Sequence, residues 1–256
     1  MTIESEGQYE GLAAAGRAAA DVLATLLEAA QPGVPTRELD RLGELRMRSH
    51  GARSAPRLGA GFPAATCISV NSEVAHGVPN HRRLRSGDLV NIDVSVELDG
   101  FWADNGASKV IGRSNPELDR LCQAGQQTLR AALGAVRSGR PLRSIGRAAQ
   151  RCAASQGYEV LRDLHGHGVG RSLHEEPANI SSHFDRRDRR RQKDGWVLAI
   201  EPFVSTGARH VVQRPDGWTL ATEDGGLAVQ YEHTVVVTRR GALVVTAAEP
   251  FLLAEA

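Results

Sequence analysis

An internal repeat is the feature that most constrains how this 256-residue chain can fold. Each copy holds a histidine element that ends in proline, a glycine-led apolar segment that ends in an acid, and a second acid further on. The copies are His76-Gly77-Val78-Pro79, Gly87 to Asp93 and Asp104, followed by His174-Glu175-Glu176-Pro177, Gly195 to Glu201 and Glu232. Carboxylates that converge in one core need cations to balance their charge. The repeat therefore predicts a metal-binding half-site that is built twice.

Two pairs of glycines upstream of these motifs keep nearly the same spacing. Gly33 and Gly139 are 106 residues apart, as are Gly51 and Gly157, and the first acids of the two copies are 108 residues apart. Repetition over this distance predicts two α+β halves related by a pseudo-twofold axis. We expect the halves to span about residues 8–112 and 113–238 of one domain, 1–256.

Hydrophobic periodicity and turn residues predict paired helices followed by strands in each half. The helices are expected over about 8–30, 36–50, 115–137 and 142–156, the first of each pair headed by Ala15-Gly16 or Ala124-Gly125. Strands are expected near 66–71, 89–98, 101–111, 168–174, 196–205, 209–214 and 227–238. This order favours an α+β fold over a doubly wound sheet.

Charge and cysteine content narrow the class of protein. The chain carries 31 Lys and Arg against 30 Asp and Glu, so its net charge of +1 does not indicate a nucleic-acid partner. Its three cysteines have no paired spacing, which favours a reducing cytoplasm over a disulfide framework or a zinc ribbon. The apolar run from Leu12 to Ala30 contains charged residues, so we expect an amphipathic helix and not a signal peptide or membrane span. The expected molecule is a cytoplasmic monomer without a membrane partner.

Taken one at a time, the four repeated acids indicate a metal ligand with different strength. Asp93 shares a strand face with polar residues, so a solvent-facing position is the alternative to a metal ligand. Asp104 follows Trp102 and has the alternative of a turn position. Glu201 ends a segment that is apolar on both faces, and a buried acid must be paired, neutralised or metal-bound. Glu232 precedes a wholly apolar run. The duplication is what makes these acids a site.

The segment His165-Gly166-His167-Gly168-Val169-Gly170 adds imidazole ligands to the carboxylates. Its glycines allow close backbone approach, and no P-loop Lys-Ser/Thr follows them. A set of oxygens and imidazoles without thiolate suits Mn, Fe(II), Co or Zn. Four carboxylates are balanced by two divalent ions, which at roughly 3.5–4 Å apart can share a hydroxide nucleophile.

Taken together, these motifs resemble the type I methionine aminopeptidases in their short bacterial form. The residues that carry the resemblance are His76-Gly77-Val78-Pro79, Asn91-Ile92-Asp93, Asp104, Gly166 to Gly170, His174-Glu175-Glu176-Pro177, Ile200-Glu201-Pro202 and Gln230 to Thr234. The similarity runs from the first predicted helix to about Val237. It implies the pita-bread fold and removal of the initiator methionine from nascent chains and peptides whose second residue is small.

The resemblance also implies roles for individual residues. The implied metal ligands are Asp93, Asp104, His167, Glu201 and Glu232. Within this set Asp104 and Glu232 would bridge the two ions, and Glu201 would also shuttle protons. His174 would hydrogen-bond the reacting peptide and His76 would contact the scissile amide nitrogen, with ordinary strand or turn positions as the alternative.

The implied pocket for the methionine side chain departs from the family at two positions. Its residues are Phe62, Cys67, His76, Leu173, His174 and Trp218. Gly59 stands where the family commonly has tyrosine, and Leu173 stands where it has an aromatic residue. We therefore expect a wider or less rigid pocket, which leaves strictness for methionine open. Ordinary core packing is the alternative role of Phe62 and Trp218.

Three further readings remain open in the sequence. The basic segment Arg186 to Lys193 is either a solvated loop or an electrostatic contact with ribosomal RNA. An aminopeptidase acting on X-Pro bonds is the second reading of the site, although the 75 residues before His76 leave little room for the extra domain such enzymes carry. A metal-free binding protein on the same scaffold is the third, and five filled ligand positions count against it.

Overall fold

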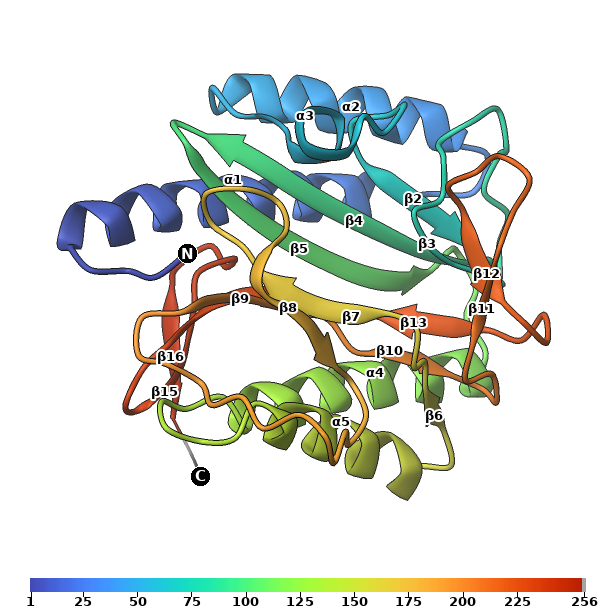
Figure 1. The fold of residues 1–256 in the computed structure, drawn as a ribbon. Coiled ribbons are helices and arrows are strands. Elements are labelled where there is room, and N and C mark those ends of the chain that lie inside the picture. Colours follow the sequence, from blue (N-terminus) through green and yellow to red (C-terminus); the bar gives the residue numbers. More distant parts are fainter. Residues whose placement is uncertain (255–256) are drawn as a thin grey trace.

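The computed structural model describes residues 1–254 and places β-sheets between two pairs of helices (Figure 1). The helices are α1 (Glu6–Ala29), α2 (Thr36–Ser49), α3 (Ala55–Ala60), α4 (Pro116–Gly134) and α5 (Arg143–Ser155). The strands before α4 are β1 (Arg53–Ser54), β2 (Cys67–Val70), β3 (Glu73–Ala75), β4 (Leu89–Leu98) and β5 (Phe101–Val110). The later strands are β6 (Glu159–Val160), β7 (His165–Gly168), β8 (Glu175–Ser181), β9 (Val197–Ile200), β10 (Phe203–Ser205), β11 (Val211–Gln213), β12 (Leu220–Thr222), β13 (Ala228–Gln230), β14 (His233–Val237), β15 (Gly241–Val244) and β16 (Phe251–Ala254). None of the described helices combines the length and apolar character that a membrane span needs.

In the first half, α1 and α2 cover one face of the sheet formed by β1, β4, β2 and β5. Val90, Ile92, Val94 and Val96 of β4 are buried in the core that α1 and α2 complete. Because side chains alternate along a strand, Asp93 faces the opposite side. Asp104 on β5 lies opposite Ser95 of β4, so it faces the same side as Asp93.

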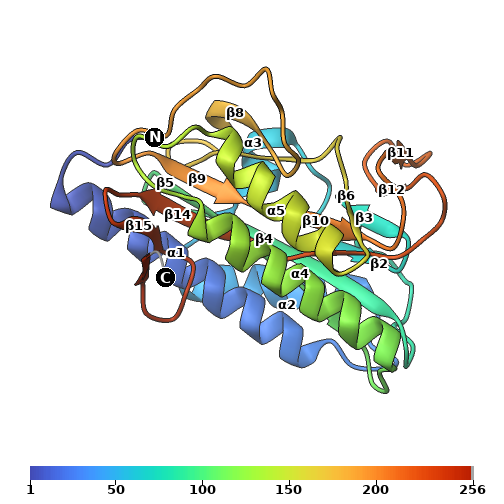
Figure 2. The same ribbon diagram turned by 90° about the horizontal axis from the view of Figure 1, so that it is seen from below.

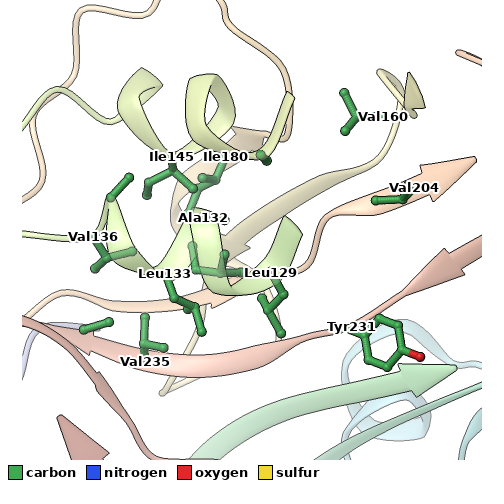
Figure 3. Close-up of a cluster of buried hydrophobic side chains, with 14 of the residues drawn as sticks. Leu129, Ala132, Leu133, Val136, Ile145, Val160, Ile180, Val204, Tyr231 and Val235 are labelled. Carbon is green, nitrogen blue, oxygen red and sulfur yellow. The ribbon is translucent and has the colours of Figure 1, made fainter. Parts of the chain in front are cut away.

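In the second half, α4 and α5 cover a six-stranded sheet with the order β16-β15-β14-β9-β7-β8 (Figure 2). Leu129 and Leu133 of α4 pack with Ile145 of α5 and Val235 of β14 in its core (Figure 3). Ile200 at the end of β9 also belongs to this core, so the next side chain, Glu201, leaves it toward the other face. The uncovered faces of the two sheets thus look toward each other.

The two halves are joined directly at the carboxylates. Ala107 of β5 forms an isolated β-bridge with Tyr231, and the amide N of Glu232 donates to the carbonyl of Gly106 at 2.9 Å. These backbone contacts place the second-half acid beside the strand that carries Asp104. The acid-bearing faces of the two sheets therefore meet along β5.

The repeated glycines are explained by the backbone. Gly33 and Gly139 have φ of +90° and +84°, and Gly51 and Gly157 have φ of +71° and +81°, a region that favours glycine. These four glycines follow the helices, as expected.

The expectation that Gly16 and Gly125 head helices was wrong. Both lie well inside their helices, α1 and α4. A Cβ at Gly16 would lie 2.3 Å from the carbonyl oxygen of Val245, and one at Gly125 would lie 2.6 Å from Val229 Cγ2. Their function is to let each long helix approach a strand closely.

All four predicted long helices are confirmed, and the strands of the second half needed correction. The strand expected at 168–174 ends at Gly168, and a turn leads to β8, which was not predicted. The strands expected at 196–205 and 227–238 are each broken, the first at Glu201-Pro202 and the second at residues 231–232. Pro202 lacks an amide proton for the ladder, which accounts for the first break. The structure also adds α3, β1, β3, β6, β12, β15 and β16.

Candidate metal centre

Side chains from both halves converge at one buried point. One potential ligand atom from each of Asp104, His167 and Glu232 lies within 4.8 Å of the others. His167 Nε2 is 3.8 Å from Asp104 Oδ2 and 3.4 Å from Glu201 Oε1. Asp93 is on the same face of the sheet as Asp104, and its carboxyl group interacts with those of Asp104 and Glu201. The five residues expected as ligands therefore lie together.

The carboxylates at this site have too few hydrogen-bond donors around them to satisfy all of their oxygens. Asp93 Oδ1 and Glu232 Oε1 are buried and have no hydrogen-bond partner among the described residues. Burial, reinforced by neighbouring carboxylates, raises the pKa of Asp93, Glu201 and Glu232 well above the usual range. Buried carboxylates are tolerated when paired or metal-bound. The orphaned oxygens thus fit a site for divalent cations.

His167 presents its ring as a metal-ligating imidazole does. Its Nδ1 lies 2.9 Å from the carbonyl oxygen of Gly168, which can only accept, so Nδ1 holds the proton. Nε2 then offers its lone pair toward Asp104 and Glu201. Burial is the main cause that lowers the pKa of His167, which favours the neutral ring. A backbone carbonyl fixing the tautomer is typical of histidine ligands.

Asp104 is held more firmly than the sequence indicated. The alternative of a turn position was wrong, because it lies in the middle of β5 and is 5% exposed. Ser95 Oγ donates to Asp104 Oδ1 at 2.7 Å, and Thr234 Oγ1 bonds both the amide and the carbonyl of Asp104 at 2.8 Å. The solvent-facing alternative for Asp93 was also wrong, since its Oδ1 is buried. Ser95 and Thr234 were missed as supporting residues, although strand alternation placed Ser95 with Asp93.

A cleft of about 650 Å³ opens onto this centre. His76, His174 and Glu201 are among the residues that line it. The His174 ring lies 4.3 Å from the His167 ring, centroid to centroid, and is exposed to the cleft. Burial, then the neighbouring His174, lowers the pKa of His76, which favours its neutral form. His76 and His174 thus line the cleft beside the carboxylate cluster.

Glu175 was missed by sequence reasoning as an organiser of this cleft. Its carboxylate accepts hydrogen bonds from the amides of Arg171 and Ser172, the second at 2.7 Å. It also contacts the α-amino group of Met1. These bonds fix the turn that precedes His174.

The residues expected in the side-chain pocket include two contact groups. Phe62 and Trp218 meet edge to face with centroids 5.2 Å apart, and Cys67 packs with them. Leu173 lies beside Gly59, where a Cβ would be 3.5 Å from both Leu173 Cβ and Trp102 Cζ3. Trp102, which sequence reasoning missed, therefore occupies space beside the two positions that lack aromatic side chains. Its place two residues before Asp104 was the available signal.

The basic segment from Arg186 to Lys193 is partly structural. Arg190 pairs with Asp188 at 3.0 Å and donates to the carbonyls of Ala178 and Asn179, which line the cleft. Arg186, Arg189 and Arg191 of the segment border a separate hollow of about 680 Å³. Its charged lining residues are Arg143, Arg186, Arg189 and Arg191.

Comparison with known proteins agrees with this geometry. The model of metallopeptidase family M24 matches residues 10–239. Methionine aminopeptidase 2 of Bacillus subtilis (strain 168) is 42% identical over 247 residues, which cover 96% of this chain and 99% of the relative. The crystal structure of methionine aminopeptidase from Rickettsia prowazekii has a TM-score of 0.92 and 35% identity, and the match covers 96% of this chain and 100% of that one.

A more distant structure shares the fold alone. Prolidase from Pyrococcus furiosus matches with a TM-score of 0.76 and 24% identity, over 97% of this chain and 66% of that one. These matches confirm the expected α+β pita-bread architecture. The chain belongs to metallopeptidase family M24 and, within it, to the methionine aminopeptidases.

Proposed function

We propose that this chain is a metal-dependent aminopeptidase that removes the N-terminal methionine from peptides and nascent proteins whose second residue is small. The observation that carries the proposal is the cluster of four carboxylates around His167, which borders a cleft that His76 and His174 also line. Similarity to methionine aminopeptidases along nearly the whole chain supports the same reaction.

The proposed cofactor is a pair of divalent ions. The ligands would be Asp93, Asp104, His167, Glu201 and Glu232. Four carboxylates balance the charge of two divalent ions, and the orphaned oxygens of Asp93 and Glu232 support this count. Bound ions would supply Lewis acidity and lower the pKa of a water molecule. Oxygen and imidazole ligands accept Co, Mn, Fe or Zn, and availability in the cell selects among them.

The chain's own residues would bind the peptide and move protons. Glu201 reaches the cleft, and its carboxylate would take a proton from the attacking water and return it to the leaving amine. His174, exposed beside His167, would donate a hydrogen bond to the reacting carbonyl. A neutral His76 would contact the scissile amide nitrogen. Phe62, Cys67, His76, Leu173, His174 and Trp218 would enclose the methionine side chain.

The setting proposed for this reaction is the cytoplasm, where nascent chains emerge. Because one chain supplies residues from both halves of the site, we propose that the monomer is the active unit. We also propose that the exposed arginines near Arg186 and Arg189 contact ribosomal RNA. Their place on a hollow outside the cleft supports this, since ribosome binding would leave the cleft open.

The ribosome interaction can be tested by charge removal. Arg186→Gln with Arg189→Gln should weaken salt-dependent binding to ribosomes several-fold, because removing a cation that binds a phosphate reduces both the affinity and its salt dependence. The matched control removes two charges from the opposite helix layer with Arg37→Gln and Arg41→Gln. Equal binding by both variants would rule the interaction out.

A peptide series tests the function itself. Protein stripped of metal and reloaded with Mn or Co should release methionine from Met-Ala-Ser and leave Ala-Pro-Ser intact. Cleavage of Ala-Pro-Ser in preference to Met-Ala-Ser would favour the X-Pro reading. A folded, metal-loaded protein that cleaves neither peptide would contradict both readings and favour a binding protein.

A further inference from the structure

A buried glutamine links the two carboxylates that the second half contributes. Gln230 is 1% exposed, and its Nε2 lies 2.8 Å from Glu232 Oε2 and 3.4 Å from Glu201 Oε2. Glu232 Oε1 has no partner among the described residues. One amide group therefore holds one oxygen of each carboxylate and leaves the other oxygen of Glu232 facing the centre.

The orientation of this amide is fixed from the first half. Asn91 Nδ2 donates to Gln230 Oε1 at 2.8 Å, so the carbonyl end of the glutamine side chain points toward β4. A flipped amide would face two carboxylates with its oxygen and Asn91 with its amino group, which would break all these bonds. Asn91 therefore determines that Gln230 donates to the acids.

The space for the amide is also provided by the first half. A Cβ on Gly106 would lie 2.5 Å from Gln230 Oε1, so only glycine admits the side chain there. Ser108 Oγ accepts from the amide N of Gln230 at 3.0 Å and donates to its carbonyl at 3.1 Å. Residues of β4 and β5 thus define one position for Gln230.

We propose that Gln230 is a positioning residue that aims Glu201 and Glu232 at the metal ions, with Asn91 setting the direction of its amide. The proposal rests on the proposed metal-dependent function. Glu201 and Glu232 lie at strand breaks, where the amide of Glu232 bonds the carbonyl of Gly106, whereas Asp104 lies inside a continuous ladder. A donor between them also reduces the repulsion of two buried carboxylates. Without it, each carboxylate could rotate away from its ligating geometry.

Metal affinity is the decisive measurement. Gln230→Ala should weaken Mn binding to the metal-free protein by roughly 10–100-fold in calorimetry, the range seen when a partner of a metal ligand is removed. Methionine release should then recover when Mn is raised. Gln192→Ala is the matched control, because Gln192 is also 1% exposed and makes buried hydrogen bonds at a distance from the metal centre. Unchanged Mn affinity in folded Gln230→Ala would overturn the proposal.

A second variant tests the direction of the amide. Asn91→Ala keeps Gln230 but frees its amide to flip, so Mn affinity should fall in the same sense and by a smaller factor. If Gln230→Ala weakens Mn binding and Asn91→Ala does not, the role assigned to Asn91 is wrong. The wild-type protein distinguishes a failure of this proposal from a failure of the proposed function. Wild-type protein that binds Mn but releases no methionine would contradict only the proposed substrate.

Discussion

The two halves of the molecule hold their carboxylates in different ways. Asp93 and Asp104 lie inside β4 and β5, each a continuous strand of ten residues. Glu201 and Glu232 lie at breaks, between β9 and β10 and between β13 and β14. The first half thus fixes short acids by an unbroken ladder, and the second half extends longer acids from gaps in its strands. Side-chain hydrogen bonds must supply the order that the second ladder lacks.

This difference explains why repetition of sequence did not mean repetition of local structure. The helices and the glycines after them follow the same pattern in both halves. The strands depart from it where Pro202 interrupts pairing. At such a break the side chain is no longer restricted to one of the two faces of the sheet. Variants at matched positions of the two halves test whether this difference matters.

The largest effect is expected from one acid of each half. Asp104→Asn and Glu232→Gln should each lower kcat/KM for Met-Ala-Ser by about 1000-fold or more, equivalent to about 4 kcal/mol of transition-state stabilisation. Each change removes a charge that the metals need, whichever half supplies it. Steady-state kinetics at fixed Mn would measure the loss. A mild effect in either variant would exclude that acid as a bridging ligand.

Substitution of the two helix glycines should lower the stability of the protein by clearly different amounts. Gly16→Ala should cost about 3 kcal/mol and Gly125→Ala about 1–2 kcal/mol of unfolding free energy. The first new methyl group would meet a backbone carbonyl, whereas the second meets side chains of Val229 and Tyr231 that can move. Urea unfolding monitored by circular dichroism measures both. Equal losses would show that the contacts at Gly16 and Gly125 tolerate an added methyl group equally well.

The pH dependence of the metal-free protein should report the crowded acids. The folded pKa of Asp93, Glu201 and Glu232 is raised, chiefly by burial, so the folded state keeps protons that the unfolded state releases. Stability should therefore be full below the unfolded pKa of about 4 and fall as pH rises toward the raised folded values. Tm measured without metal from about pH 5 to 8 tests this, with Mn added as the control. The slope should be smaller in Glu201→Gln, and a Tm that rises with pH would contradict the expectation.

The smallest effect is expected where Gly59, Leu173 and Trp102 lie together. Leu173→Phe should change kcat/KM for Met-Ala-Ser by about 10-fold, the lower end of the roughly 10–200-fold that small changes in an apolar pocket cause. Trp102→Ala should widen the pocket and raise activity on Phe-Ala-Ser relative to Met-Ala-Ser. The ratio of kcat/KM for the two peptides is the measurement. An unchanged ratio would place Trp102 outside the pocket.

Most of the site could be predicted because the histidine and acid motifs occur twice in the same order along the sequence. Glu201 was expected to be buried from the apolar residues on both sides, and its side chain is 12% exposed. The helices followed from periodicity and from Gly33, Gly51, Gly139 and Gly157. These features depend on local patterns that a single sequence contains.

Other features depended on contacts between distant residues and could not be predicted. Gly16 was read as a helix start because the sequence does not show that Val245 lies against it. Trp102 was noted only as a neighbour of Asp104, and its approach to Gly59 follows from the fold. The hydrogen bond from Asn91 to Gln230 joins residues 139 positions apart. Tertiary packing decided each of these.

The most direct test of the central claim is methionine release from Met-Ala-Ser by metal-free protein as Mn is added. We expect no release without metal, and release that rises to saturation as Mn fills the site formed by both halves. Release at full rate from protein shown to contain no metal would contradict the claim.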